Sequence, residues 1–215
     1  MPVTTTSKIR SKDGTTIAFD RAREVEDVEA LIAEAGGSAF VVGGSSGAVL
    51  ALEAAARGLP IKKLALYEPP FIVADSRPPL PSDYVKRLTD LVATGRRGDA
   101  VELFMTKAVG LPAELVPQMR AAPMWPALES VAHTLAYDGT VMGDTMSGKP
   151  LSTGRWARVT VPTLVIDGGA SPEWARHAVQ ALADQLPNAE RRTLEGQTHD
   201  VDPKALAPVL QEFFA

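Results

Sequence analysis

Hydrophobic residues along the chain form short strand-like runs that alternate with segments of helical spacing. The runs typical of strands occupy residues 39–42, 63–67, 163–166 and 191–194. Segments with helical spacing occupy residues 23–35, 46–57, about 172–186 and about 203–214. Strands that alternate with helices predict parallel βαβ units. We therefore expect an α/β fold: a three-layer sandwich with a mostly parallel sheet and helices on both faces.

Two segments depart from this alternation. The first segment, residues 8–19, contains Lys8–Ser11 and Thr15–Phe19 on either side of an Asp13-Gly14 pair, which predicts a β-hairpin. The second segment, residues 71–160, is first proline-rich, then helical with interruptions from 83 to about 135, and over 138–160 rich in Gly, Ser and Thr, which indicates a loop. We expect one domain over residues 1–215, with 71–160 inserted as a lid above the carboxyl ends of the strands. Open α/β sheets bind their ligands at those ends.

Composition excludes several classes of function. A 215-residue chain that is 45% hydrophobic and 22% charged is typical of one globular domain. The net charge of −4 argues against a nucleic acid or an anionic membrane as the partner. No apolar run is long enough to cross a membrane, and the polar residues 1–6 do not resemble a secretion signal. With no cysteine, thiol catalysis is excluded. We expect a cytoplasmic protein.

The motif with the most specific chemistry is Gly43-Gly44-Ser45-Ser46-Gly47, which lies between a predicted buried strand and a predicted helix. Small residues allow a sharp turn that presents Ser45 as a nucleophile. The helix dipole and the Ser46 backbone N–H would stabilise an oxyanion, and we place Gly44 in the same oxyanion site. The alternative is a glycine-rich turn without catalytic function, or one that binds phosphate.

A serine nucleophile needs a base, and the chain has three histidines. His177 lies in a predicted helix and His133 in the helical insertion. His199 follows the last predicted strand, at the edge of the sheet that also presents Ser45, so we expect His199 to be the general base. Two carboxylates that end parallel strands, Glu68 and Asp167, are candidates to orient it, with a slight preference for Glu68.

No other constellation points to chemistry. The spacing of the acidic residues and histidines forms no metal-binding pattern, and the chain lacks a P-loop and a dinucleotide fingerprint. We expect neither a metal nor a cofactor.

Together these residues resemble the α/β-hydrolase superfamily over nearly the whole chain. Gly43–Gly47 is similar to its nucleophile elbow, the Asp13-Gly14-Thr15 hairpin to its opening strands, and Leu194–His199 to its histidine loop. Ser171 stands where the resemblance implies the usual acid, counted from Gly168. The resemblance implies a small bacterial serine hydrolase that needs no cofactor.

The chain departs from that family before the elbow. The family has a strand, a helix and another strand between the hairpin and the helix before the elbow, whereas here Phe19 runs almost directly into Arg23. The resemblance implies that about 60 residues are missing, with the loop that donates a second oxyanion N–H. The 39–42 strand would then have an open edge. We expect either the Lys8–Phe19 hairpin or a second copy of the chain, in a homodimer, to cover it.

Three functional hypotheses follow from these observations. The first is an esterase, thioesterase or lactonase that acts on a small acyl ester through Ser45, His199 and Glu68 or Asp167. The second is a catalytically impaired hydrolase-fold protein that binds a ligand or a partner. A third hypothesis keeps Ser45 and His199 for an elimination or a carbon–carbon cleavage. The sequence leaves the identity of the substrate open.

Overall fold

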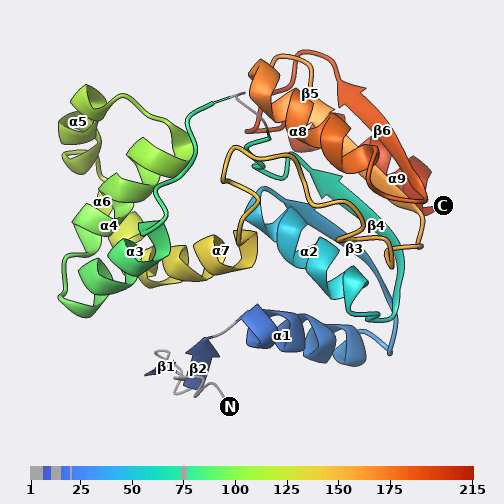
Figure 1. Ribbon diagram of the computed structural model, residues 1–215, viewed down its shortest axis with the longest axis horizontal. Coiled ribbons are helices and arrows are strands. Elements are labelled where there is room, and N and C mark those ends of the chain that lie inside the picture. Colours follow the sequence, from blue (N-terminus) through green and yellow to red (C-terminus); the bar gives the residue numbers. More distant parts are fainter. Residues whose placement is uncertain (1–6, 11–15, 20, 74–76) are drawn as a thin grey trace. The chain divides into compact units, whose positions relative to one another are not determined.

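The chain divides into two compact units, Met1–Pro78 with Asp144–Ala215, and Pro79–Gly143 (Figure 1). The computed structural model describes residues 7–10, 16–19, 21–73 and 77–215, with side chains from residue 24 onward. None of the helices in these ranges is both long and apolar enough to span a membrane.

The first unit contains a four-stranded parallel sheet in the order β3-β4-β5-β6. Its strands are β3 (Ala39–Gly44), β4 (Ile61–Tyr67), β5 (Thr163–Gly168) and β6 (Ala189–Leu194). All four strands were predicted, and each extends beyond its predicted bounds because the flanking residues continue the pairing. Gly43 and Gly44, for example, pair with Leu66 and Tyr67. The predicted α/β class with a parallel sheet is confirmed.

Helices cover both faces of this sheet (Figure 1). They are α2 (Ser46–Ala56), α8 (Glu173–Ala183) and α9 (Pro203–Phe214), whereas α1 (Arg21–Glu34) packs against α2. Helix α2 packs on β3 and β4, and α8 packs on β5 and β6. On the opposite face, apolar residues of α9 pack against a buried cluster that includes Ala65, Tyr67 and Ile166. Strands β4 and β5 thus lie inside a three-layer sandwich, as predicted.

The second unit is helical and has a core of its own. Its elements are α3 (Tyr84–Ala93), α4 (Arg97–Leu103), η1 (Phe104–Val109), η2 (Ala113–Leu115), α5 (Val116–Arg120), α6 (Trp125–Val131), η3 (Ala132–Thr134) and α7 (Leu135–Met142). Buried residues such as Leu88, Val101 and Trp125 form the core. The prediction of a loop over residues 138–160 was wrong for residues 138–142, which belong to α7. Gly139 is compatible with this helix because α3 packs closely there: an added Cβ would lie 2.9 Å from the Val85 side chain.

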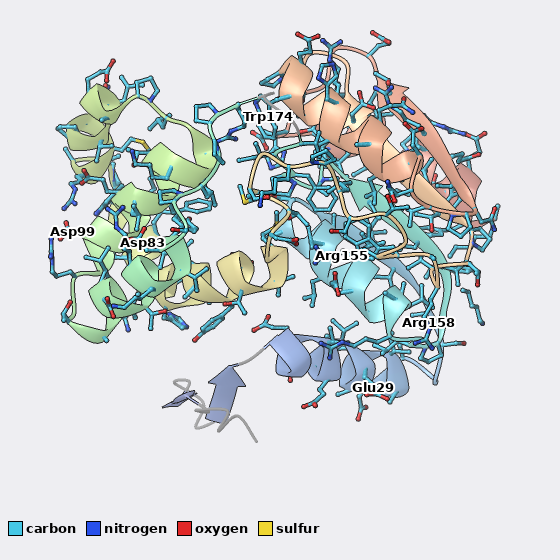
Figure 2. The ribbon with its side chains drawn as sticks, in the orientation of Figure 1. Glu29, Asp83, Asp99, Arg155, Arg158 and Trp174 are labelled. Atoms are coloured by element: carbon cyan, nitrogen blue, oxygen red, sulfur yellow. The ribbon has the colours of Figure 1, made fainter. Side chains whose placement is uncertain are left out.

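Residues 144–162 return to the first unit without a helix or strand and are held against α2 (Figure 2). Arg155 Nη2 and Trp156 Nε1 donate to Glu53 Oε1 of α2 over 3.0 and 3.1 Å. The Trp156 ring, which is buried, stacks on Phe71 at a centroid distance of 5.6 Å. These contacts fix a segment whose sequence predicts only a loop.

Strand β3 has one neighbour, β4, among the residues that the structure describes. Phe40 and Val42 are each 48% exposed, although they lie in an apolar strand. The N-terminal hairpin, β1 (Ser7–Arg10) with β2 (Thr16–Phe19), forms a separate two-stranded sheet, and its turn lies outside the described residues. Docking of this hairpin on β3 stays a prediction, and so does pairing with a second copy along this edge.

Candidate active site

Ser45 occupies the single position between the end of β3 and the start of α2. Its backbone angles are φ 54° and ψ −129°, a conformation that a non-glycine residue adopts at a cost of about 1–3 kcal/mol. The Ser45 N–H donates to the carbonyl of Tyr67 on β4 over 2.9 Å, and the Ser45 carbonyl accepts from Ala48 N–H over 3.0 Å. These hydrogen bonds hold the strained turn. The geometry is that of a nucleophile elbow, with the helix N-terminus beside the serine.

The first glycine of the motif is required by close packing of the strand against the helix. A Cβ added at Gly43 would lie 2.4 Å from the Gly47 carbonyl oxygen and 2.7 Å from Ala48 Cα. At Gly44 an added Cβ would meet nothing within 4 Å. The two adjacent glycines therefore differ: Gly43 lets α2 approach β3, whereas Gly44 leaves open space beside Ser45.

Gly43→Ala is expected to destabilise the chain by more than the 1–3 kcal/mol typical of overpacking, because both clashing atoms belong to the backbone and cannot rotate away. The melting temperature followed by circular dichroism measures this effect. Gly44→Ala is the matched control and should melt within a degree or two of the wild type. Equal melting temperatures for the two variants would contradict the close approach of α2.

Glu68, the residue after β4, is brought to His199. Its Oε2 lies 2.8 Å from His199 Nδ1, and its Oε1 accepts the Gly168 N–H over 2.8 Å. The Glu68 side chain is buried, and its φ of 43° again lies in the left-handed region. A buried carboxylate with both oxygens engaged is well suited to hold an imidazole in one orientation. The His199 side chain itself is 53% exposed, so a reactant can approach it.

The Glu68 side chain stays ionised although it is buried. Burial by itself raises the pKa of Glu68, but hydrogen bonds with His199 and the Gly168 N–H outweigh it and lower the pKa below its ordinary value of 4.5. Glu68 is thus a carboxylate at neutral pH. Ser171, the residue at the position where the family resemblance implies the acid, is buried, and its hydroxyl has no hydrogen-bond partner among the described residues.

Asp167, the other candidate acid, is paired with a different residue, Arg191. It is fully buried at the end of β5, where Arg191 Nε and Nη2 donate to its two oxygens over 2.9 and 3.1 Å. The Thr193 hydroxyl adds contacts of 3.2 and 3.3 Å to the same oxygens. The structure therefore brings Glu68, and not Asp167, to His199. Sequence reasoning gave Glu68 only a slight preference, because both acids follow predicted parallel strands.

The loop that carries His199 follows β6 and is fastened to the loop after β5. Its Gln197 carbonyl accepts the Ala170 N–H over 2.9 Å and would lie 2.3 Å from a Cβ at Gly168. The Gln197 side chain accepts the Asp202 N–H, also over 2.9 Å, just before α9. The close approach at Gly168 also lets its N–H reach Glu68. Sequence reasoning used Gly168 only to count positions; its place at the end of a buried strand was the signal for this packing role.

No metal site competes with this interpretation among the residues for which side chains are described, because no three acidic residues or histidines gather there. Of the other histidines, His177 lies exposed on α8 beside Glu173, with 3.4 Å between Nε2 and Oε1. Exposed pairs of this kind contribute little to stability.

Comparison with known families agrees with the α/β fold described above. The model of the "Alpha/beta hydrolase family" matches residues 11–209. The chain belongs to this family. Among curated proteins, none matches the chain significantly.

Solved structures of other family members overlay on this α/β hydrolase. An alpha/beta hydrolase from Sphaerobacter thermophilus is 58% identical, with a TM-score of 0.84, and the match covers 96% of this chain and 79% of that one. MenH from S. aureus is 18% identical, with a TM-score of 0.56 and coverage of 96% and 78%. The 2-hydroxy-6-oxo-6-phenylhexa-2,4-dienoate hydrolase of Rhodococcus sp. strain RHA1 is 21% identical, with a TM-score of 0.54 and coverage of 90% and 70%. The family match and the Sphaerobacter relative support hydrolase activity, and the two distant structures show the shared fold.

Proposed function

We propose that this α/β hydrolase is a serine hydrolase that cleaves small acyl esters, thioesters or lactones. The observation that carries the proposal is the 2.8 Å contact between His199 Nδ1 and the buried Glu68 carboxylate. This contact favours the tautomer with a proton on Nδ1, which leaves Nε2 free to accept a proton. The strained conformation of Ser45 and its place at the N-terminus of α2 support the serine as the nucleophile.

In the proposed reaction, Ser45 Oγ attacks the acyl carbonyl carbon while His199 Nε2 takes the serine proton. The Ser46 N–H and the dipole of α2 stabilise the oxyanion, with Gly44 in the same site. His199 returns the proton to the leaving alcohol, and the acyl group stays on Ser45. Water, deprotonated by His199, then attacks the acyl-enzyme; the bond between the acyl carbon and Ser45 Oγ breaks, His199 returns the proton to Ser45 Oγ, and the carboxylic acid is released. Glu68 keeps the imidazole oriented and stabilises its positive charge in both steps.

We also propose that the chain lacks the second oxyanion donor and that its activity is therefore weak. In the structure α1 begins two residues after β2 ends, and within the described ranges β3 pairs only with β4. The match leaves about a fifth of the Sphaerobacter hydrolase without a counterpart in this chain, which is compatible with the proposed missing segment. Loss of one oxyanion donor typically lowers turnover by about 10²–10³-fold.

Trapping the covalent intermediate tests the proposed function. A p-nitrophenyl phosphonate should phosphonylate Ser45 and release p-nitrophenolate, and digestion with mass spectrometry should locate the adduct. Since the chain has no cysteine, no thiol competes for the reagent. The exposed Ser152 provides a matched control: Ser152→Ala should react like the wild type, and Ser45→Ala should not react. An unlabelled wild-type Ser45 would favour the ligand-binding alternative.

A further inference from the structure

We infer that Tyr67 is a positioning residue that fixes the nucleophile elbow and the histidine loop relative to each other. This inference rests on the proposed function, because it assigns Tyr67 a role through Ser45 and His199. Tyr67 is the last residue of β4 and directly precedes Glu68. Its backbone and its side chain bond to different parts of the site.

The backbone of Tyr67 holds the elbow. Its carbonyl accepts the Ser45 N–H over 2.9 Å, which continues the β3–β4 pairing beyond the strand and into the turn. Ser45 has a positive φ, so this hydrogen bond stabilises a conformation that the chain would otherwise avoid. The position of Ser45 is therefore set by the end of β4.

The side chain of Tyr67 holds the histidine loop. Its hydroxyl donates to the Thr198 carbonyl over 2.5 Å, one residue before His199. Tyr67 is only 4% exposed, and it packs among Ala65, Leu164, Ile166 and Leu194. This packing fixes the position of the ring and therefore of its hydroxyl. Burial raises the pKa of Tyr67, and the nearby carboxylates of Glu68 and Asp167 raise it further, so the hydroxyl stays protonated and remains a donor.

The loop needs this anchor because the residues next to His199 give little packing, although Val201 at its end packs against the cluster around the Tyr67 ring. Thr198 and His199 are exposed, and the loop from Glu195 to Val201 contains no helix or strand. Apart from the contact of His199 with Glu68, the other hydrogen bonds of this loop in the described part of the chain involve Gln197. Without the Tyr67 hydroxyl, the contact of His199 with Glu68 would be the nearest remaining interaction that holds the loop in place. A misplacement of catalytic groups by about 1 Å costs on the order of 10²-fold in rate.

Tyr67→Phe removes this single oxygen and should lower kcat for a p-nitrophenyl ester by about 10–100-fold with KM unchanged. Tyr84→Phe is the matched control, because Tyr84 is also a buried tyrosine but belongs to the core of the helical unit. The control should keep the wild-type kcat. Equal kcat values in Tyr67→Phe and the wild type, or equal losses in both variants, would overturn the inference.

NMR of the histidine proton separates this inference from the proposed function. The His199 Nδ1 proton, which bonds to Glu68, should exchange with water at least about tenfold faster in Tyr67→Phe than in the wild type and in Tyr84→Phe. This readout holds even if the wild type hydrolyses no ester. An unchanged exchange rate in Tyr67→Phe would refute the positioning role, whereas absent turnover with changed exchange would refute only the proposed function.

A measurement on the wild type covers the case in which Tyr67→Phe does not fold. The Tyr67 hydroxyl proton should give a slowly exchanging resonance with an NOE to backbone protons of Thr198 or His199. A hydroxyl proton in fast exchange, without that NOE, would overturn the inference.

Discussion

Ser45→Ala is expected to lower the turnover of p-nitrophenyl acetate by about 10⁶-fold, which leaves only hydrolysis in buffer. His199→Ala should cause a loss of the same size, because an unactivated serine hydroxyl is a poor nucleophile. The double variant should lose no more than either single variant, since the two side chains act as one unit. Initial rates, with each protein compared at equal folded concentration, measure these effects.

Two exposed residues provide matched controls for these variants. Ser152 lies on the surface of the first unit, and His177 is an exposed histidine on α8. Ser152→Ala and His177→Ala should keep wild-type rates. A wild type without turnover, or a Ser45→Ala variant with unchanged turnover, would identify the chain as a binding protein on the hydrolase fold.

Glu68→Gln should lower kcat by about 10⁴-fold while the fold is retained. The Gly168 N–H needs an acceptor, so the glutamine oxygen should face Gly168 and its NH₂ group should face His199 Nδ1. That arrangement favours the wrong tautomer, in which Nε2 carries the proton and cannot accept one from Ser45. Steady-state kinetics with a short-chain p-nitrophenyl ester tests this result.

Asp167→Asn provides the contrast. It weakens the pair with Arg191 at a buried position and should lower the melting temperature, whereas kcat of the folded protein should stay near that of the wild type. The opposite pattern, with kcat lost in Asp167→Asn and kept in Glu68→Gln, would assign the orienting acid to Asp167.

The dependence of stability on pH in the acid range gives an independent readout of the ionisation of Glu68. Its pKa is lower in the folded chain than its ordinary value of 4.5, so its ionisation stabilises the fold at neutral pH. That contribution begins to be lost as the pH falls below 4.5 and disappears as the pH passes through the lowered folded value. The melting temperature of the wild type should therefore fall more steeply over this acid range than that of Glu68→Gln.

Much of the fold was predictable because the signals are local. An apolar run such as Ala39–Val42 next to an alanine-rich helix predicts a buried strand and the helix that packs on it, whatever the rest of the chain does. The elbow was predictable for the same reason: its glycines, its serine and the flanking elements are consecutive. Helix α7 was missed because Gly139 indicates a break by itself, and only its packing against α3 shows why glycine suits that helix.

The sequence by itself determined the α/β class, the elbow at Ser45 and the histidine that follows the last strand, because each depends on neighbours in the chain. Tertiary structure alone separated Glu68 from Asp167. Both acids end parallel strands, and the difference lies in partners distant in sequence: His199 for Glu68 and Arg191 for Asp167. Such contacts depend on strand order and register. A carboxylate's role is set by the groups within hydrogen-bond reach, and residues far apart in the chain become neighbours only when the sheet forms.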